Sequence, residues 1–394
     1  MAKGGGLFTP EDKVLAVLVV FVPATLLGSR LGWPRWVVFF LSVAAVVPLA
    51  GFIGAATEAL ADRIGARTGG LLNATFGNAP DLLIGIFGVQ RGLIPLVKAT
   101  LIGALISNSA LIMGACYIVA GLRYGRPRFR RAEAGHHSVL MMLTLAAALF
   151  PTAGALVLCG GDTCREGTAQ GAIMATSVGI AVVLLLVYLA YVGFGIFGWE
   201  RLRGPWREGR TERELRERGR SGPGARWPVW LSLVVLAAST ALVIPVIDVL
   251  TATVQDVVGA LGWSQVFIGM VIVANAGNVA EGYAALRLAF SKPAQPGEGA
   301  GADSGLDLAL GIASASSIQI ATFVAPIVVL FSLLATPMTL SFPAVEVAIL
   351  GLLVIVFAYI AQDGESNWLE GVQLVGLYLM AAVIFYALPE KVFA

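Results

Sequence analysis

The chain has 394 residues and a net charge of +2, with 58% hydrophobic and only 13% charged residues. Its mean hydropathy of +0.85 excludes an ordinary soluble globular protein, in which about 25% of residues are charged. The near-neutral charge gives no support for a nucleic-acid partner. We interpret the sequence as an all-α polytopic membrane protein embedded in a lipid bilayer, because helices satisfy their backbone hydrogen bonds internally.

Eleven stretches are long and apolar enough to cross the roughly 30 Å hydrocarbon core of a bilayer as helices. No small-residue cleavage site follows the first stretch, so we expect it to be retained rather than removed as a signal peptide. The predicted spans lie near residues 13–29, 35–61, 68–90, 93–121, 137–158, 168–198, 227–250, 263–290, 305–334, 343–361 and 368–388.

The distribution of basic residues predicts the orientation of these spans. With a cytoplasmic N-terminus, six of the 26 basic residues fall outside and the other 20 fall in the cytoplasm, where positive residues are enriched. We therefore predict a cytoplasmic N-terminus and an external C-terminus. The short termini fit a prokaryotic plasma membrane. On this topology the loop between Cys159 and Cys164 is external, where the spacing permits a disulfide without requiring one.

Two similar motifs predict two inverted repeats. FGNAPD (76–81) lies in the third span and AGNVAE (276–281) in the eighth, so the two helices cross the membrane in opposite directions. Similar segments follow both motifs, GLIPLVKATLIGALISN and GLDLALGIASASSIQI. Inverted repeats that bind substrate near the midplane are typical of secondary transporters. We predict an extra N-terminal transmembrane helix (1–33), a five-helix repeat (34–199), an Arg-rich cytoplasmic linker (200–226) and a second five-helix repeat (227–394).

Each motif ends in an acid at membrane depth, Asp81 in the first and Glu281 in the second. A carboxylate there costs about 2.5 to 3.5 kcal/mol on insertion scales, so it needs a compensating partner. Close helix packing is an alternative role for small and polar residues, and we prefer it for Gly77, Gly103, Gly277 and Ser314. Packing alone does not explain an acid at both repeat-related positions.

The residues around these acids are suited to a hard cation. The Gly-Asn pair of each motif allows backbones to approach closely or a helix to break, and a broken helix exposes carbonyl oxygens. Oxygen ligands without Cys or His favour a divalent alkaline-earth ion, are compatible with Mn2+, and do not resemble a Cu(I) site or a typical zinc site. Further oxygen-bearing side chains follow the motifs at Ser107, Asn108, Ser316, Ser317 and Gln319.

Charge balance suggests how two such acids could couple two ions. Two carboxylates can be neutralised by two protons or by one divalent cation, but not by both together. A neutralised site crosses more easily between outward-facing and inward-facing states. We therefore expect antiport, with the cation and the proton as transported substrates and with no resident cofactor.

The motif regions resemble those of a known family. Residues 56–108, together with FIGMVIVANAGNVAEG and LALGIASASSIQIATF, are similar to the two signatures of the calcium/proton antiporters, the CAX branch of the cation/calcium exchanger superfamily. The resemblance implies that Asp81 and Glu281 bind the transported ion. It leaves Glu58 either at a proton or ion entrance or at the membrane interface near Arg63. The supporting ligands that it implies are Asn78, Asn278, Ser107, Asn108, Ser316 and Gln319.

Several residues depart from the family pattern. Asp81 stands where Glu is usual, Ala104 where Ser is usual and Gly282 where His is usual. The shorter Asp side chain predicts a wider site or a different ion preference. The 200–226 linker is Arg-rich rather than acidic, so calcium sensing through that segment is not expected here.

Other titratable residues give weaker signals. Asp248 lies where family members often have an acid. We expect Glu346 and Asp363 at the membrane interface, and also His136 and His137, which follow a basic cluster.

Calcium export in exchange for protons is the first functional hypothesis. The alternative is sodium-driven calcium exchange or proton-coupled export of Na+, K+ or Mn2+, which the same oxygen ligands could serve. The inverted repeat disfavours a channel. An enzyme is not expected, because no nucleophile with a matched base is evident.

Overall fold

The computed structural model describes residues 10–64, 72, 75–129, 131–160, 168–195, 227–290, 305–360, 362 and 364–388. These residues form helices and short connections, and their β-structure is limited to one isolated bridge between Arg128 and Glu365. The Arg-rich linker, Cys164, Asp363 and the side chains of His136 and His137 lie outside the described residues. Predictions about them stay predictions.

Nine helical segments among the described residues are long and apolar enough to cross a membrane. Two shorter apolar helices, Ala79–Gln90 and Ala344–Ile360, occupy the places of the third and tenth predicted spans. The all-α polytopic class is therefore confirmed. The count of eleven spans stays a prediction, because the two shorter helices have 12 and 17 residues, and about 20 are needed to cross a bilayer.

The helices before the central linker are α1 (Pro10–Leu18), α2 (Phe21–Arg30), α3 (Arg35–Ile64), α5 (Ala79–Gln90), α6 (Ile94–Ile106), the π-helix η1 (Ser107–Ile112), α7 (Met113–Tyr124), α8 (Arg131–Cys159) and α9 (Thr168–Gly195). Those after it are α11 (Val229–Leu261), α12 (Gln265–Phe267), η3 (Ile268–Val273), α13 (Ala274–Ala289), α14 (Gly305–Gln319), η4 (Ile320–Val324), α15 (Ala325–Ser332), α16 (Ala344–Ile360) and α17 (Trp368–Ala387).

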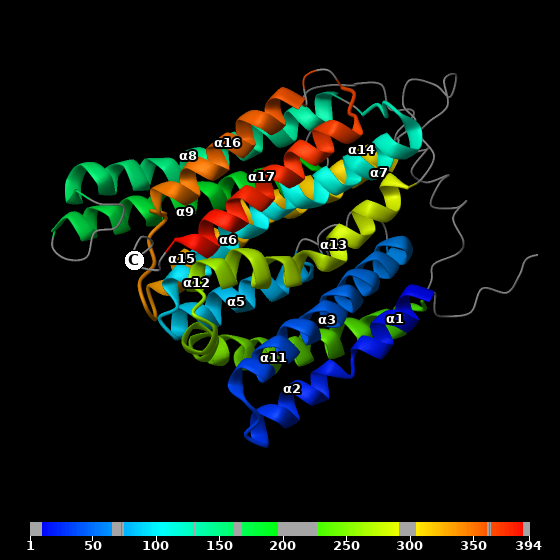
Figure 1. Ribbon diagram of the computed structural model, residues 1–394, viewed down its shortest axis with the longest axis horizontal. Coiled ribbons are helices and arrows are strands. Elements are labelled where there is room, and N and C mark those ends of the chain that lie inside the picture. Colours follow the sequence, from blue (N-terminus) through cyan, green and yellow to red (C-terminus); the bar gives the residue numbers. More distant parts are fainter. Residues whose placement is uncertain are drawn as a thin grey trace, which may run out of the picture.

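The helices form three groups (Figure 1). On one side of the bundle α11 packs along α3, and α1 and α2 pack against α3; on the other side α8 packs against α9 and α16. Between them lie α5, α6, α13 and α14, which carry the two motifs and the segments that follow them. The paired helices α3 and α11 begin the two predicted repeats, and each contains an interior proline, Pro48 and Pro245. The division into two repeats stays a prediction.

One helix is longer than predicted. The seventh span was expected to end at residue 250, but α11 continues to Leu261 and ends at Gly262, whose φ of 70° is in the left-handed region. The additional turns are amphipathic: Val254 and Val257 are buried, whereas Asp256 is exposed. Hydropathy alone underestimates such a segment, because its polar face lowers the average while its apolar face still packs.

The centre of the bundle is α6, in which every residue from Leu96 to Ile106 is buried. A helix that is apolar on all sides is suited to the interior of a bundle. It packs against η3 through glycines: a Cβ built on Gly103 would lie 2.6 Å from Met270 Cα, and one on Gly269 would lie 2.7 Å from the Leu96 carbonyl oxygen. These contacts bring the helix after the first motif against the helix that carries the second.

The contact at Gly103 predicts a measurable loss of stability. Gly103→Ala places a methyl group against the Met270 backbone, which cannot move away as a side chain can, and we expect a cost of about 1 to 3 kcal/mol. Thermal unfolding of the purified protein in detergent measures it. Gly179→Ala on α9 is the matched control, because a Cβ there meets no atom within 4 Å. Equal unfolding temperatures for both variants would contradict the close approach.

Candidate cation site

Polar side chains from both predicted repeats meet in the middle of the bundle. Asn78, at the N-cap of α5, donates from Nδ2 to Oε1 of Gln319 at the end of α14. Asn108, in η1, donates from Nδ2 to Oγ of Ser316 at 2.9 Å. All four side chains are buried. Each bond therefore joins a residue before the central linker to one after it.

Two further bonds cross between the same regions. Ser107 donates from Oγ to Oδ1 of Asn275 at 2.7 Å, and Asn278 donates from Nδ2 to the carbonyl oxygen of Ala104 at 3.4 Å. The asparagine of each motif thus bonds to the segment that follows the other motif. This reciprocal pattern is what two interlocked inverted repeats predict.

The backbone differs between the two motifs. Gly77 and Asn78 form a turn before α5, and Asn78 makes no side-chain capping bond, so its amide can reach Gln319. In the second motif Gly277 and Asn278 lie inside the continuous helix α13, so of the two expected alternatives, close approach or a helix break, the close approach is found there. The π-helical turn η3 directly precedes α13, and such turns recur at functional sites.

The two motif acids meet at one face of α13. Glu281 belongs to this helix, and Asp81 belongs to α5 and contacts it. Asp81 is 6% exposed, and a Cβ built on Gly277 would lie 2.8 Å from its Oδ1. Gly277 and Glu281 are four residues apart on this helix and therefore share a face. The Asp81 carboxylate therefore approaches the helix face that carries Glu281. The structure therefore brings the two predicted ion-binding acids together.

Three oxygen atoms in this cluster are buried without a hydrogen-bond donor: Asp81 Oδ1, Glu281 Oε2 and Asn108 Oδ1. Buried polar atoms are normally hydrogen-bonded, so such atoms need an explanation. The described residues contain no group of three or more His, Cys, Asp or Glu side chains that could hold a metal. A cation bound here would combine two carboxylates with amide, hydroxyl and carbonyl oxygens, a set suited to Ca2+.

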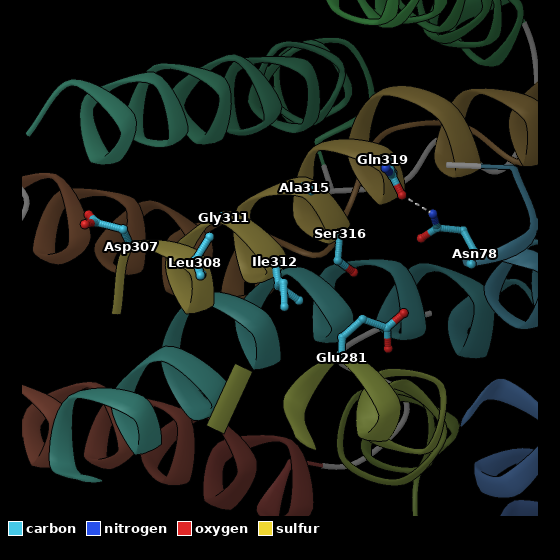
Figure 2. Close-up of a pocket in the computed structure, with 10 residues that line it drawn as sticks. Asn78, Glu281, Asp307, Leu308, Gly311, Ile312, Ala315, Ser316 and Gln319 are labelled. Atoms are coloured by element: carbon cyan, nitrogen blue, oxygen red, sulfur yellow. Dashed lines mark hydrogen bonds between the residues drawn. The ribbon is translucent and has the colours of Figure 1, made fainter. Parts of the chain in front are cut away.

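A cavity of about 380 Å³ lies beside Glu281 (Figure 2). Asp307 and Gln319 mark the ends of the face of α14 that lines it, and Gly77 and Asn78 also contribute. Twelve residues of helix correspond to about 18 Å. On the predicted topology α14 begins in the cytoplasm, so this cavity leads from the cytoplasmic side to Glu281.

Five predicted site residues do not line this cavity: Asp81, Glu58, Asn278, Ser107 and Asn108. Asp81 does not line it and instead contacts α13 at Gly277, one turn before Glu281. Glu58 is exposed on α3 and is also absent from the lining. Its predicted place at an entrance stays a prediction.

The sequence interpretation missed two residues of the site. Asn275 accepts from Ser107 and donates from Nδ2 to the Val271 carbonyl oxygen at 2.7 Å and to Tyr378. Its position three residues before Asn278, on the same helix face, was the available signal. Asp307 is buried and lines the cavity. An acid in the first turn of an apolar helix gave no comparable signal.

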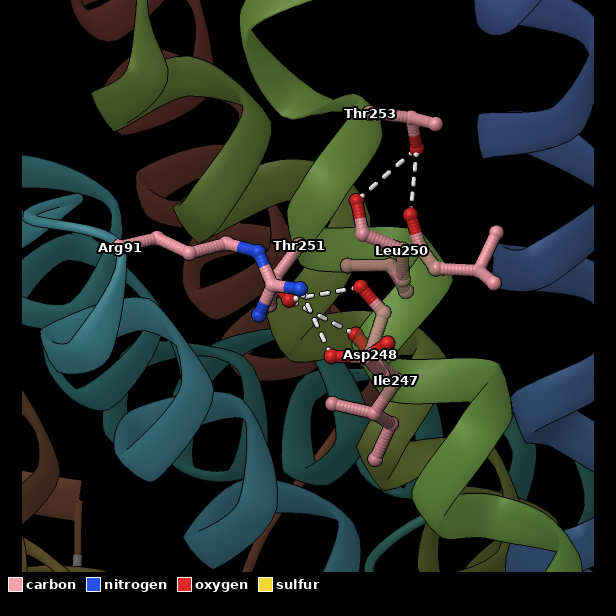
Figure 3. Close-up of polar contacts among 7 residues, drawn as sticks. Arg91, Ile247, Asp248, Leu250, Thr251 and Thr253 are labelled. Atoms are coloured by element: carbon pink, nitrogen blue, oxygen red, sulfur yellow. Dashed lines mark hydrogen bonds and ion pairs between the residues drawn. The ribbon is translucent and has the colours of Figure 1, made fainter. Parts of the chain in front are cut away.

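Two acids outside the motifs are also placed by the structure. Asp248 on α11 accepts from Arg91 at 2.7 Å, where α5 ends (Figure 3). This partly exposed ion pair joins the two predicted repeats. Glu346, in the first turn of α16, is 1% exposed and therefore covered by protein. Its predicted depth at the membrane interface stays a prediction.

A bundle of membrane helices around a polar cavity with two buried acids defines a membrane transport protein. The chain belongs to the family described as "Sodium/calcium exchanger protein", which it matches over residues 35–197 and 231–387. It is also similar to the calcium/proton antiporters, as the motifs predicted.

Relatives of known name are similar along almost the whole chain. The "Ca(2+)/H(+) antiporter ChaA" of Bacillus subtilis (strain 168) is 33% identical over 379 residues, 96% of this chain and 100% of the relative. The "Ca(2+)/H(+) antiporter" of Synechocystis sp. (strain ATCC 27184 / PCC 6803 / Kazusa) is 34% identical over 391 residues, 97% and 99% of the two chains. The solved structure titled "Structure of native YfkE" matches with a TM-score of 0.76 and 32% identity, covering 95% of this chain and 100% of that one.

From the contact between Asp81 and Gly277 we predict that a larger residue at position 277 weakens cation binding. Gly277→Ala puts a methyl group where Asp81 Oδ1 now lies, so the carboxylate must move, and we expect Ca2+ affinity to fall about tenfold, or 1.4 kcal/mol. Calorimetric titration of the purified protein measures this. Gly54→Ala on α3, where a Cβ meets no atom within 4 Å, is the control. An unchanged affinity in Gly277→Ala would place the cation elsewhere.

Proposed function

We propose that this integral membrane protein exports Ca2+ from the cytoplasm in exchange for protons by alternating access. The family and the names of the relatives support calcium/proton exchange. We place it in a prokaryotic plasma membrane with its N-terminus in the cytoplasm. The observation that carries the proposal is the pair of donor-free carboxyl oxygens, on Asp81 and Glu281, held together between the predicted repeats.

The coupling follows from the charge of this pair. Two carboxylates in an apolar bundle need positive charge nearby, and either two protons or one divalent cation can supply it. Because both ligands use the same oxygens, binding of one displaces the other. A site that changes orientation only when neutralised then exchanges Ca2+ for protons and moves neither alone.

The neighbouring side chains support a role as further ligands. Asn108 uses its NH2 group to bond Ser316, which leaves Oδ1 free to face a cation. Asn78 and Gln319 line the cavity, and Asn278 and Ser107 hold the two motif regions together. Calcium accepts six to eight oxygen ligands in flexible geometry, so water can complete the shell.

The cavity supports an inward-open state. It runs along α14 from Asp307 toward Glu281, the direction expected of a cytoplasmic access path. At the predicted external end the Arg91–Asp248 ion pair joins α5 to α11. Alternating access requires this external contact to open when the cytoplasmic path closes.

Transport in inside-out membrane vesicles tests the proposal. We expect radiolabelled Ca2+ uptake to follow an imposed pH gradient and to stop when an ionophore collapses it. Asp81→Asn combined with Glu281→Gln removes both negative charges and should reduce uptake at least about 100-fold, as expected for loss of the charge that binds both ions. The control is Asp256→Asn, at an exposed acid on α11. Proton-coupled uptake that survives the double substitution would refute the proposal.

The same vesicles decide between the proposal and its alternative. Oxygen ligands also accommodate Na+, K+ and Mn2+, and the family description includes sodium. Uptake driven by a sodium gradient at equal pH would establish sodium-driven exchange instead. Uptake of Mn2+, Na+ or K+ in place of Ca2+, at a fixed pH gradient, would change the transported cation but keep the coupling.

We infer that Glu58 belongs to the ion or proton entrance, since it is an exposed acid near the predicted cytoplasmic end of α3. An acid at an entrance raises the local cation concentration without binding the cation tightly. Glu58→Gln should therefore raise the KM for Ca2+, weaken its dependence on ionic strength and leave the maximal rate unchanged. Asp62→Asn, at an exposed acid one turn further along α3, is the control. An equal effect of both substitutions would point to general surface charge.

A further inference from the structure

A second pair of charged residues is buried away from the motif acids. Lys98 on α6 is 6% exposed and Glu346 in the first turn of α16 is 1% exposed. Neither carboxyl oxygen of Glu346 receives a hydrogen bond. A buried carboxylate without donors is costly, so this arrangement requires an explanation that helix packing does not supply.

The ammonium group of Lys98 is bonded elsewhere. It donates to the carbonyl oxygen of Ser341 and lies 5.8 Å from the centroid of the Phe342 ring. The connection that contains these residues is fixed to two other helices: the Phe342 amide donates to Thr152 Oγ1 at 2.9 Å, and the Leu340 amide donates to Ser177 Oγ at 2.9 Å. Lys98 is thus held in place independently of Glu346.

Lys98 is brought toward Glu346 by its bond to Ser341, which lies three residues before α16 begins. Of the elements packed against α16, which are α6, α8, α17 and η1, α6 contributes this lysine. Among described side chains, Arg131 begins α8 and Glu370 lies in the first turn of α17, both at the opposite end of the bundle from Glu346. The described part of η1 contains no charged residue.

We propose that Glu346, beside Lys98, is a second proton-binding site, separate from the site where protons and the cation compete. Both carboxyl oxygens are free, so a proton can bind without breaking a hydrogen bond. A positively charged Lys98 repels a divalent metal ion more strongly than a proton, which favours a proton as the ligand. Proton uptake replaces a donor-free buried anion by a neutral acid and thereby removes its desolvation cost.

Because this site lies between α6 and α16, binding of a proton affects the contact between these two helices. The pair links α6, before the central linker, to α16, after it. Lys98 lies nine residues before Ser107, the first residue of η1, which is about 14 Å along the helix. When Glu346 is ionised it attracts Lys98, and when it is protonated this attraction is lost. The contact between α6 and α16 therefore depends on pH, without any competition for the cation.

Infrared difference spectroscopy of the purified full-length protein in lipid tests the proposal directly. Spectra are recorded between acidic and alkaline pH in saturating Ca2+, which on the proposed function has displaced the protons of Asp81 and Glu281. We expect a remaining carboxylic C=O band that titrates, is absent from Glu346→Gln, and persists in Asp81→Asn combined with Glu281→Gln. An identical band in wild type and Glu346→Gln would overturn the second site. Failure of Ca2+ to displace any carboxyl band would instead count against the proposed function.

Two further variants keep the test decisive if Glu346→Gln does not fold. Glu346→Asp retains a carboxyl group and should retain a titrating band. Lys98→Met should move the titration of the band toward higher pH, because removal of a neighbouring positive charge favours the neutral carboxyl group. A band unaffected by Lys98→Met would show that the carboxyl group is not Glu346.

Transport measurements distinguish a proton-binding role of Glu346 from a purely structural one. In reconstituted vesicles, and resting on the proposed exchange, Glu346→Gln should leave the KM for Ca2+ unchanged and flatten the pH dependence of the maximal rate. Glu346→Asp should restore that dependence. A purely structural role predicts an equal loss of rate at every pH, and that result would overturn the proposal.

Discussion

The rest of the structure depends on negative charge held in the membrane without hydrogen-bond donors. Asp81 contacts the helix that carries Glu281, and buried oxygens of both carboxyl groups lack donors. In an apolar bundle this arrangement is costly unless positive charge is present. The protein tolerates the cost because the surrounding helices are tightly fixed, and the same cost makes binding of a proton or a cation favourable.

Close packing makes this arrangement possible. Gly103 and Gly269 allow α6 and η3 to meet backbone to backbone, and Gly277 leaves room for the Asp81 carboxylate. Hydrogen bonds from Asn78 and Asn278 then connect each motif to the segment after the other. Small residues and interhelical amide bonds are the usual means of joining helices in lipid. Here they also position a site, so packing and binding are two results of the same residues.

The sequence singled out Asp81 and Glu281 because their signal combines charge, repetition and predicted depth. It predicted the oxygen-bearing residues Ser107, Asn108, Ser316 and Gln319 because they lie in the similar segments that follow the two motifs. Asp307 and Glu346 have no such repetition, and a single acid near a helix end reads equally well as an interfacial residue. Only packing reveals that Glu346 is buried, because neighbours distant in sequence cover it.

The sequence by itself determined the membrane class, the helical architecture and the pair of acids, because hydropathy and the cost of buried charge act on each segment separately. Tertiary structure decided the contacts: Asp81 against Gly277, Asn78 with Gln319, and Lys98 beside Glu346. It also decided that the second motif stays helical while the first begins at a turn. These features depend on the rotation and separation of helices, which are set by side-chain packing between segments and leave no period in the sequence.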